Sequence, residues 1–208
     1  MPSFDLKAHW DRIYAERSPA EVSWYQSEPT VSLELVRRSG IAPDRPIIDV
    51  GGGASNFVDH LLVGGYQQIA VLDISVRALG HAQARLGPSA ERVEWYEADV
   101  TAFLPPHRFA LWHDRAVFHF LTEAQARRDY VQVLERALLP DGQAIIATFG
   151  IGGPMKCSGL ETVQYDTAAL GAILGEGFRL VESLHETHLT PRGAPQLFGY
   201  HRFARRHQ

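Results

Sequence analysis

The sequence has almost no cysteine, no long apolar run and no excess of basic charge. Cys157 is the only cysteine among 208 residues, so no disulfide can form within the chain, and a reducing compartment is favoured over secretion. No stretch approaches the roughly 20 apolar residues that a membrane-spanning helix needs, and residues 1–14 lack the apolar core of a signal peptide. We therefore expect a soluble, cytoplasmic protein.

The charge of the chain is nearly balanced. A formal net charge of −4 and a pI near 6.2 give no basic face for a phosphate backbone, and residues 201–207 form the one dense basic cluster, so no nucleic acid partner is expected. The sequence has no internal repeat and no long Pro/Gly/Ser linker. We expect one domain, a monomer or a homodimer, in which residues 1–40 are a helical, aromatic cap segment and residues 41–208 the main body.

Strand-like and helix-like segments alternate along residues 41–149, and this alternation predicts a parallel sheet covered on both faces. Residues 178–189 and 196–206 read as two further strands, and the Thr190–Pro195 loop between them is too short to hold a helix. The expected fold is therefore α/β: a three-layer, doubly wound, mostly parallel seven-stranded sheet with a C-terminal antiparallel hairpin. The expected parallel strands are 46–50, 68–74, 92–100, 108–114 and 143–149.

Acidic residues end four consecutive predicted strands: Asp49, Asp73, Asp99 and Asp114. In a doubly wound sheet, ligands bind outside the carboxyl ends of the strands. A single aspartate there is often only a helix cap or a turn residue. Four in succession favour a ligand site.

A glycine turn, Asp49-Val-Gly51-Gly-Gly53-Ala-Ser55-Asn56, follows the first of these strands. The dinucleotide pattern G-x-G-x-x-G/A requires Gly or Ala at position 56, where this chain has Asn, and the P-loop lysine is also missing. The turn therefore argues against an NAD site of the usual pattern and against a P-loop.

An ordered set of motifs across residues 40–205 resembles the class I S-adenosylmethionine-dependent methyltransferases. The motifs are "IIDVGGGAS", "VLDIS", "YEADVTAF", "ALWHDRAVFHFL" and "LLPDGQAIIATF". The resemblance implies that residues 41–208 are the methyltransferase domain and that S-adenosyl-L-methionine is the cofactor, with S-adenosyl-L-homocysteine as product and no metal. Ser55 departs from the family pattern, which has glycine at that position.

The resemblance also assigns roles around the cofactor. Gly51 and Gly53 would admit the methionine part, Asp49 would lie near its amino group, and Asp73 would accept hydrogen bonds from the ribose hydroxyls. Asp99 and the Val100 backbone would receive the adenine amino group, and Ile74 would cover the adenine ring. Asp114 completes the predicted cofactor set, with Tyr14 and Trp24 as candidates from an aromatic lid.

The acceptor is expected beyond the fourth strand. Arg115, Phe118 and Cys157 are the candidates for its pocket, and residues 150–166 form a long segment that would border it. His119 is either a general base or part of an aromatic wall. Trp10-Asp11-Arg12-Ile13-Tyr14 and Asp114-Arg115, with His119 at the end of that stretch, partly resemble enzymes that methylate lysines of translation elongation factors, although many of those enzymes have Asp at the position of His119.

These observations favour a methyltransferase that modifies N, O or S of a small-molecule acceptor, with a protein lysine as the alternative acceptor. Two other classes stay open. One is a non-catalytic protein that holds the cofactor or a metal through Cys157 and the histidines, although their spacing matches no zinc pattern. The other is a nucleotide-dependent oxidoreductase.

Overall fold

One seven-stranded sheet in the order β3-β2-β1-β4-β5-β9-β8 runs through the centre of the computed structural model, which describes residues 4–206. Residues 1–3 of the predicted cap and 207–208 of the predicted main body lie outside the described residues. The strands of this sheet are β1 (Ile47–Val50), β2 (Ile69–Asp73), β3 (Val93–Glu97), β4 (Phe109–Arg115), β5 (Leu138–Phe149), β8 (Phe178–Leu189) and β9 (Pro195–Arg205). The short pair β6 (Lys156–Cys157) and β7 (Leu160–Glu161) stands apart.

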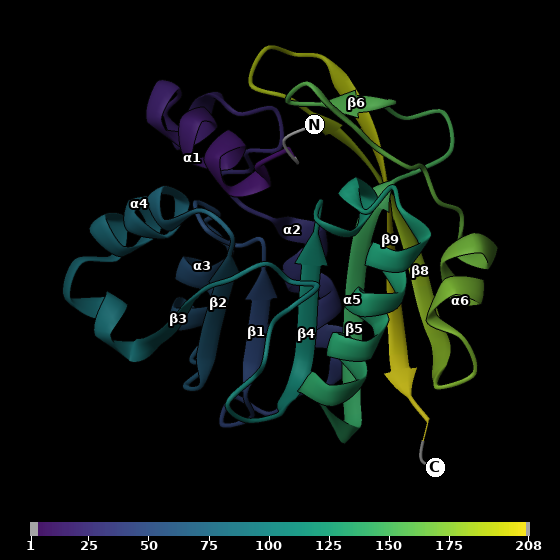
Figure 1. Cartoon of the computed structure of the whole chain (residues 1–208). Coiled ribbons are helices and arrows are strands. Elements are labelled where there is room, and N and C mark those ends of the chain that lie inside the picture. The colour runs from purple at the N-terminus through teal and green to yellow at the C-terminus, as the bar shows by residue number, and fades with distance from the viewer. Residues whose placement is uncertain (1–3, 207–208) are drawn as a thin grey trace.

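Helices cover both faces of the sheet. The strands β1 and β2 are accordingly mostly apolar and buried at every residue. Side chains of α2, α3 and α4 pack on one face, and those of α5 and α6 on the other (Figure 1). The helices are α1 (Leu6–Glu16), α2 (Thr30–Ser39), α3 (Phe57–Val63), α4 (Val76–Leu86), α5 (Ala124–Ala137) and α6 (Thr167–Leu174), with short turns η1 (Pro19–Glu21), η2 (Gly87–Arg92) and η3 (Phe118–Phe120).

The predicted fold class is confirmed. Strands β1 to β5 pair in parallel, whereas β9 pairs antiparallel with both β5 and β8. The hairpin connection is short, as expected, and β9 is the strand that runs against the others.

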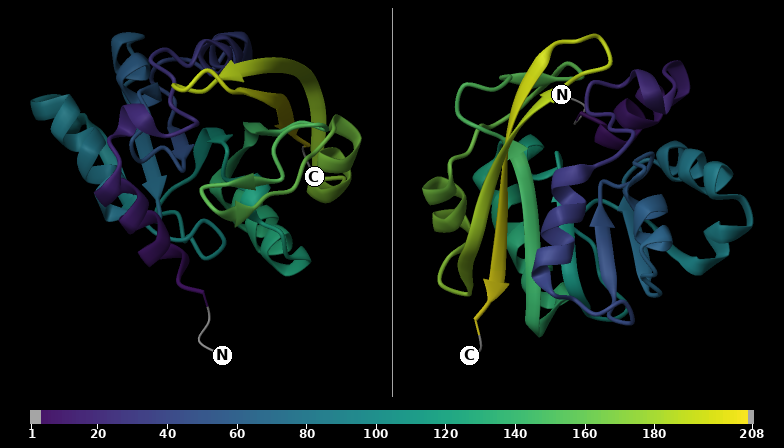
Figure 2. Two further views of the ribbon diagram at one scale, coloured as in Figure 1. Left: turned by 90° about the horizontal axis from the view of Figure 1, so that it is seen from above. Right: turned by 180° about the vertical axis from the view of Figure 1, so that it is seen from behind.

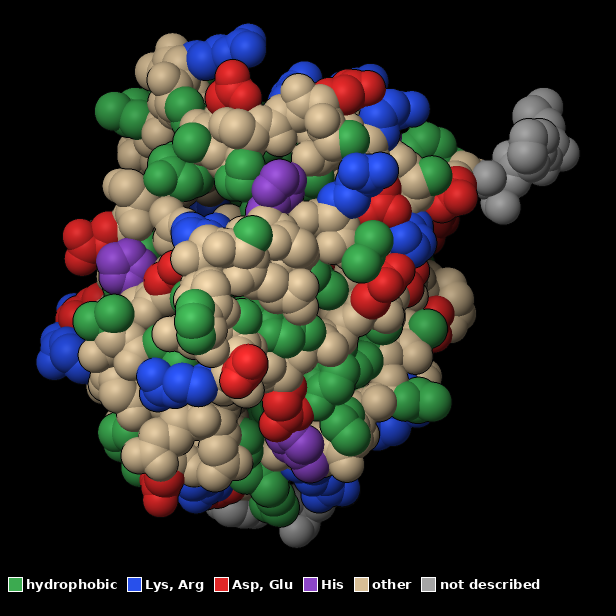
Figure 3. All heavy atoms as spheres, turned by 90° about the vertical axis from the view of Figure 1, so that its left-hand side faces the viewer, with side chains coloured by type: hydrophobic (Ala, Val, Ile, Leu, Met, Phe, Trp, Pro, Cys, Tyr) green, Lys and Arg blue, Asp and Glu red, His purple; other side chains and the backbone are tan. Residues whose placement is uncertain are grey.

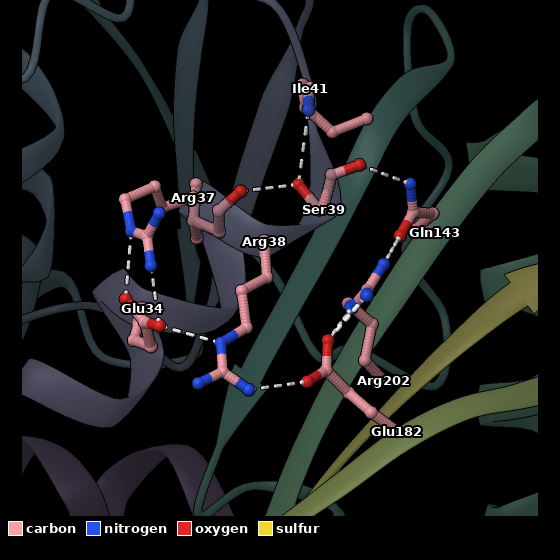
Figure 4. A network of polar contacts seen from close by, with 9 residues as sticks. Glu34, Arg37, Arg38, Ser39, Ile41, Gln143, Glu182 and Arg202 are labelled. Carbon is pink, nitrogen blue, oxygen red and sulfur yellow. Dashed lines mark hydrogen bonds and ion pairs between the residues drawn. The ribbon is translucent and has the colours of Figure 1, made fainter.

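A polar network fastens α2 to the terminal hairpin (Figure 4). Glu34 accepts hydrogen bonds from Arg37 and Arg38 within α2, and Arg38 also donates to Glu182 of β8 at 3.1 Å. Glu182 in turn pairs with Arg202 of β9, which reaches Gln143 of β5. The basic cluster 201–207 thus supplies a structural ion pair through Arg202.

Three segments lie over the carboxyl ends of the strands. They are α1, the segment that carries β6 and β7, and the tip of the β8–β9 hairpin (Figures 1 and 2). Asp11 of α1 accepts a hydrogen bond from Ser75 Oγ at 2.7 Å, and the Tyr14 carbonyl lies 3.0 Å from His81 Nε2, so α1 is anchored to the start and the body of α4.

The face that carries α1 and α4 mixes acidic, basic and apolar side chains (Figure 3). Within residues 4–206, every helix is too short or too polar to cross a lipid bilayer.

Candidate cofactor and acceptor site

The glycine turn after β1 has no space for side chains. A Cβ on Gly51, whose φ is +67°, would lie 2.0 Å from Val117 Cγ2, and one on Gly52 would lie 2.1 Å from Asp49 Oδ2. A Cβ on Gly53 would lie 2.5 Å from Asp73 Oδ2. All three positions therefore require glycine, including Gly52, which the sequence motif left without a role.

Asp73 ends β2 beside this turn and faces a cavity. Its Oδ2 accepts a hydrogen bond from the Gly53 amide at 3.0 Å, and its Oδ1 accepts one from the Ser75 amide at 2.8 Å. Burial raises the pKa of the Asp73 carboxyl to about 6, and the two backbone donors oppose that rise. Each carboxylate oxygen can accept a further hydrogen bond, so ligand hydroxyls can be received here.

Asp49 lies in a buried chain of hydrogen bonds. Its Oδ1 is 2.7 Å from His113 Nδ1, and His113 Nε2 is 2.9 Å from Ser32 Oγ. The Asp49 Oδ2 atom is buried without a hydrogen-bond partner among residues 4–206. Asp49 and His113 line a small cavity next to Gly51 and Gly52.

The main cavity has a volume of about 280 Å³ and opens at the carboxyl ends of β1, β2 and β4. It brings together many of the predicted site residues: Tyr14, Trp24, Gly51, Asp73, Ile74, Asp99, Val100, Arg115 and Cys157. Trp10 stands edge-on to both Trp24 and Phe120, so aromatic rings from α1, the next loop and η3 form one wall. Predicted residues that were far apart in sequence thus meet at one place.

Asp99 lies in the cavity wall after β3. Its Oδ1 accepts hydrogen bonds from the Thr101 amide at 2.8 Å and the Thr101 hydroxyl at 2.7 Å. These bonds fix the carboxylate and leave Oδ2 available for a ligand donor.

Further cavity residues lie in the stretch 113–123 at the end of β4 and after it, where the sequence predicts the acceptor pocket because this connection lies at the carboxyl edge of the sheet. They are Val117, Phe120, Leu121, Thr122 and Glu123. Ala126 of α5, Leu6 of α1 and Thr101 after β3 also line the cavity and were missed from the sequence.

Asp114 and Phe118, two predicted site residues, lie behind the cavity wall. Asp114 is fully buried and accepts hydrogen bonds from the Tyr130 hydroxyl at 2.7 Å and the Val117 amide at 3.0 Å. It therefore holds the β4–η3 turn against α5. Phe118 packs in the core against Tyr130 and Tyr165.

His119, the predicted base, also lies outside the cavity lining. Its ring stacks on Phe149, and its Nδ1 accepts a hydrogen bond from the Phe149 amide at 3.2 Å. Burial lowers the pKa of His119 to about 3, with a smaller effect from the positive charge of Arg115. The geometry supports the other interpretation left open by the sequence, an imidazole in an aromatic wall.

Cys157 of β6 reaches the cavity from the segment 150–166. Its Sγ lies 3.9 Å from Ser23 Oγ, and burial raises the pKa of the thiol. A thiol held in its neutral form is a poor nucleophile and a poor metal ligand. Across residues 4–206, no group of three or more His, Cys, Asp or Glu side chains is arranged to hold a metal ion.

Comparison with known proteins finds a matching family model. Residues 47–142, which run from the start of β1 into β5, match the model described as "Methyltransferase domain". The match covers slightly less than half of the chain. This match and the fold confirm the predicted resemblance to the class I S-adenosylmethionine-dependent methyltransferases.

Solved structures share the fold of this chain. The N-methyltransferase NodS from Bradyrhizobium japonicum WM9, in complex with S-adenosyl-L-homocysteine, superposes with a TM-score of 0.70 at 19% identity, over 96% of this chain and 97% of that one. A structure described under the conversion of a disulfide bond into a thioacetal group during echinomycin biosynthesis gives a TM-score of 0.79 at 18% identity, over 97% and 92% of the two chains.

The curated relatives are much longer than this chain. The eEF1A lysine and N-terminal methyltransferase of Bos taurus is 24% identical over 173 residues, which are 82% of this chain but 24% of that protein. The corresponding protein of Mus musculus gives a similar match, 24% identity over 178 residues. The chain therefore spans about a quarter of the length of the curated relatives it matches.

Proposed function

We propose that this protein is a methyltransferase that transfers a methyl group from S-adenosyl-L-methionine to a nucleophilic N, O or S atom of a small-molecule acceptor. The observation that carries the proposal is the main cavity, in which Asp73 and Asp99 lie in the same lining as the aromatic residues of α1 and η3. The lining thus combines carboxylates with aromatic rings, as a nucleoside cofactor and a small acceptor require.

The residues present fit the proposed cofactor. The turn at Gly51–Gly53 keeps its backbone free of side chains, and Asp49 Oδ2 is a buried acceptor without a partner among the described residues. Asp49 would receive the amino group and Asp73 the ribose hydroxyls. Asp99, the Val100 backbone and Ile74 would hold the adenine.

The cofactor, when bound, supplies a sulfonium methyl that is already electrophilic, so the protein has to orient the acceptor and exclude water. Trp10, Trp24 and Phe120 form an apolar wall that limits water near the reacting atoms. Because His119 lies outside the cavity, we propose that the chain supplies no histidine base and that the acceptor reacts as an amine, thiolate or other group nucleophilic by itself.

Two features favour a small acceptor over a protein lysine. The α1 helix and the segment 150–166 lie over the carboxyl ends of the strands (Figure 2), and both contribute residues to the cavity lining, so an acceptor has to fit between them. Arg115 adds a positive charge to the wall, which disfavours a lysine ammonium group. Protein lysine methylation is the second candidate, since the curated relatives are lysine and N-terminal methyltransferases.

The proposal is tested by incubating the protein with methyl-labelled cofactor and a panel of thiols, amines and carboxylates, alongside a host lysate separated by size. Label in the small-molecule fraction supports the proposal, whereas label in protein alone selects the lysine alternative. Cofactor binding without any label would indicate a binding protein. Tight NAD(H) binding without affinity for the methyl donor would indicate an oxidoreductase.

A binding experiment tests the cofactor assignment separately. Replacing Asp73 by Ala removes the proposed ribose acceptor and should weaken S-adenosylhomocysteine binding by roughly 1.5–3 kcal/mol in calorimetry. Glu161→Ala is the control, because Glu161 pairs with Lys156 on the surface and lies outside the cavity lining. Equal affinity of the two variants would contradict the role of Asp73.

A further inference from the structure

Arg115 at the end of β4 is held rigidly by its surroundings. Its Nε donates a hydrogen bond to the Tyr200 hydroxyl at 2.8 Å, and its Nη1 donates to the Trp24 carbonyl at 2.9 Å. The guanidinium carbon lies 4.4 Å from the centre of the Phe198 ring. The side chain is 10% exposed, so its position is set by packing and not by solvent.

One nitrogen of this guanidinium has no hydrogen-bond partner. Arg115 Nη2 is buried and unpaired among residues 4–206. The nearest carboxylate oxygen, Glu186 Oε2, is 4.0 Å away and already accepts a hydrogen bond from the Tyr200 hydroxyl at 2.6 Å. Buried donors are nearly always paired, so an unpaired one in a cavity wall is available to a ligand group.

Arg115 stands where the two cavities meet. It lines the main cavity and the small one, together with Tyr14, Trp24 and Gly51. Asp49 also lines the small cavity, and its Oδ2 is likewise buried without a hydrogen-bond partner among residues 4–206. An unpaired cationic donor and an unpaired anionic acceptor in one cavity are complementary to the carboxylate and the ammonium of an α-amino acid.

We propose that Arg115 binds a ligand carboxylate through Nη2. This inference rests on the proposed function, and it extends that function to a residue that fixes one end of a ligand. The carboxylate belongs either to the amino-acid end of the cofactor or to the acceptor. In both cases a planar guanidinium favours a carboxylate over a neutral group, because it offers directed N–H donors and a fixed charge.

The experiment compares two probes in calorimetry. S-adenosylhomocysteine has the amino-acid end, whereas 5′-methylthioadenosine has the same nucleoside and thioether without it. The variants are Arg115→Gln and Arg115→Lys, with Tyr200→Phe as the control that removes the Nε acceptor but keeps the guanidinium. The ratio of the two affinities within each variant separates a local effect from a general loss of folding, and Arg115→Lys serves if Arg115→Gln does not fold.

If the carboxylate is that of the cofactor, Arg115→Gln weakens S-adenosylhomocysteine about tenfold or more and leaves 5′-methylthioadenosine unchanged. If it is that of the acceptor, both nucleosides bind as before, and acetate, benzoate or glycine binds the S-adenosylhomocysteine complex of the unmodified protein but not that of the variant. The inference is overturned if two results are found together. The ratio of the two affinities is the same in Arg115→Gln as in the unmodified protein, and carboxylates either do not bind or bind equally well to both proteins.

Failure of the proposed function would give a different result from failure of this inference. If the unmodified protein binds neither nucleoside, the cofactor assignment is wrong. The carboxylate titration of the free protein then decides the role of Arg115 alone, and a response lost in Arg115→Gln but kept in Tyr200→Phe supports it.

Discussion

His113 Nδ1 lies 2.7 Å from Asp49 Oδ1, and the two side chains come from neighbouring strands of the sheet. The imidazole stacks on Phe57 of α3 and reaches Ser32 of α2 with its other nitrogen. Two helices and two strands are thus connected through one ring, which orients Asp49 beside the glycine turn.

Replacing His113 by Phe keeps a ring against Phe57 but removes both nitrogens. We expect a loss of about 1–3 kcal/mol in the free energy of unfolding, or more, because the Asp49 carboxylate loses its buried partner. The affinity for S-adenosylhomocysteine should fall as well. Ser32→Ala removes only the outer hydrogen bond and should cost about 1 kcal/mol without changing affinity. Denaturant unfolding and calorimetry check both, and an unaffected His113→Phe protein would refute the positioning role.

The Gly53 position should not tolerate alanine. The added Cβ would lie 2.4 Å from Ala78 Cβ and 2.5 Å from Asp73 Oδ2, so either α4 or the aspartate must move. We expect Gly53→Ala to destabilise the protein by about 1–3 kcal/mol and to weaken cofactor binding. Gly80→Ala is the matched control within α4, where no atom lies within 4 Å, and should stabilise the helix by up to about 1 kcal/mol. Thermal melts of the two variants would show opposite shifts.

His119 is expected to affect stability and not chemistry. In His119→Phe the Phe149 amide loses its acceptor, which should cost about 1–3 kcal/mol in the free energy of unfolding. Affinity for S-adenosylhomocysteine should stay the same, because the ring lies outside the cavity. Once an acceptor is known, methyl transfer measured on the folded fraction should also persist. A stable variant that binds the cofactor but does not turn over would restore the base assignment.

The sequence predicts the position of the cavity more accurately than it predicts which side chains line it. Asp73 and Asp99 follow directly from the rule that parallel strands end at one edge, and both line the cavity. Asp114 does not, because β4 continues to Arg115 and alternate residues point to opposite faces, so Asp114 faces Tyr130 while His113 faces α3. The sequence predicts that this strand ends at Asp114, one residue before its end in the structure, and the residue at the actual end, Arg115, lines the cavity.

The position of His119 depends on long-range packing. The η3 turn directs its ring against Phe149 of β5 and towards Phe198 of β9, and these contacts join parts of the chain that no local pattern relates. Arg115 was predicted as a pocket residue, yet its unpaired Nη2 depends on Tyr200, Trp24 and Phe198 all being in place. A local motif can place such a residue near the site. Only the tertiary structure shows whether its side chain packs in the wall or has an atom free to bind a ligand.

Glu182 should contribute more to stability than a typical surface acid. It pairs with Arg38 and with Arg202, and Arg202 is nearly buried (Figure 4). We expect Glu182→Gln to cost about 1–3 kcal/mol, because the Arg202 charge would lose its partner. Glu161→Gln breaks an ion pair whose side chains are both 63% exposed and should cost less than about 1 kcal/mol. Equal unfolding free energies of the two variants would show that the network does not fasten α2 to the hairpin.

The pKa of Asp73, raised to about 6 by burial, predicts how cofactor binding depends on pH. The folded protein keeps this proton at pH values where the unfolded chain has lost it, so this group makes the free protein less stable as the pH rises through the interval up to about 6. Ribose hydroxyls donate to the ionised carboxylate, so binding requires the proton to leave. S-adenosylhomocysteine should therefore bind up to about tenfold more weakly for each pH unit below about 6 and with constant affinity above it.

Calorimetry between about pH 5 and about pH 8 measures this dependence. Asp73→Asn should remove it, because no proton is left to lose. Asp114→Asn is the matched control: the pKa of Asp114 is also raised to about 6 by burial, but its carboxylate bonds to Tyr130 and lies outside the cavity lining, so this variant should keep the dependence. An affinity of the unmodified protein that does not change across the range would mean that Asp73 is not the ribose acceptor, since an acceptor at this position must be ionised to bind both hydroxyls.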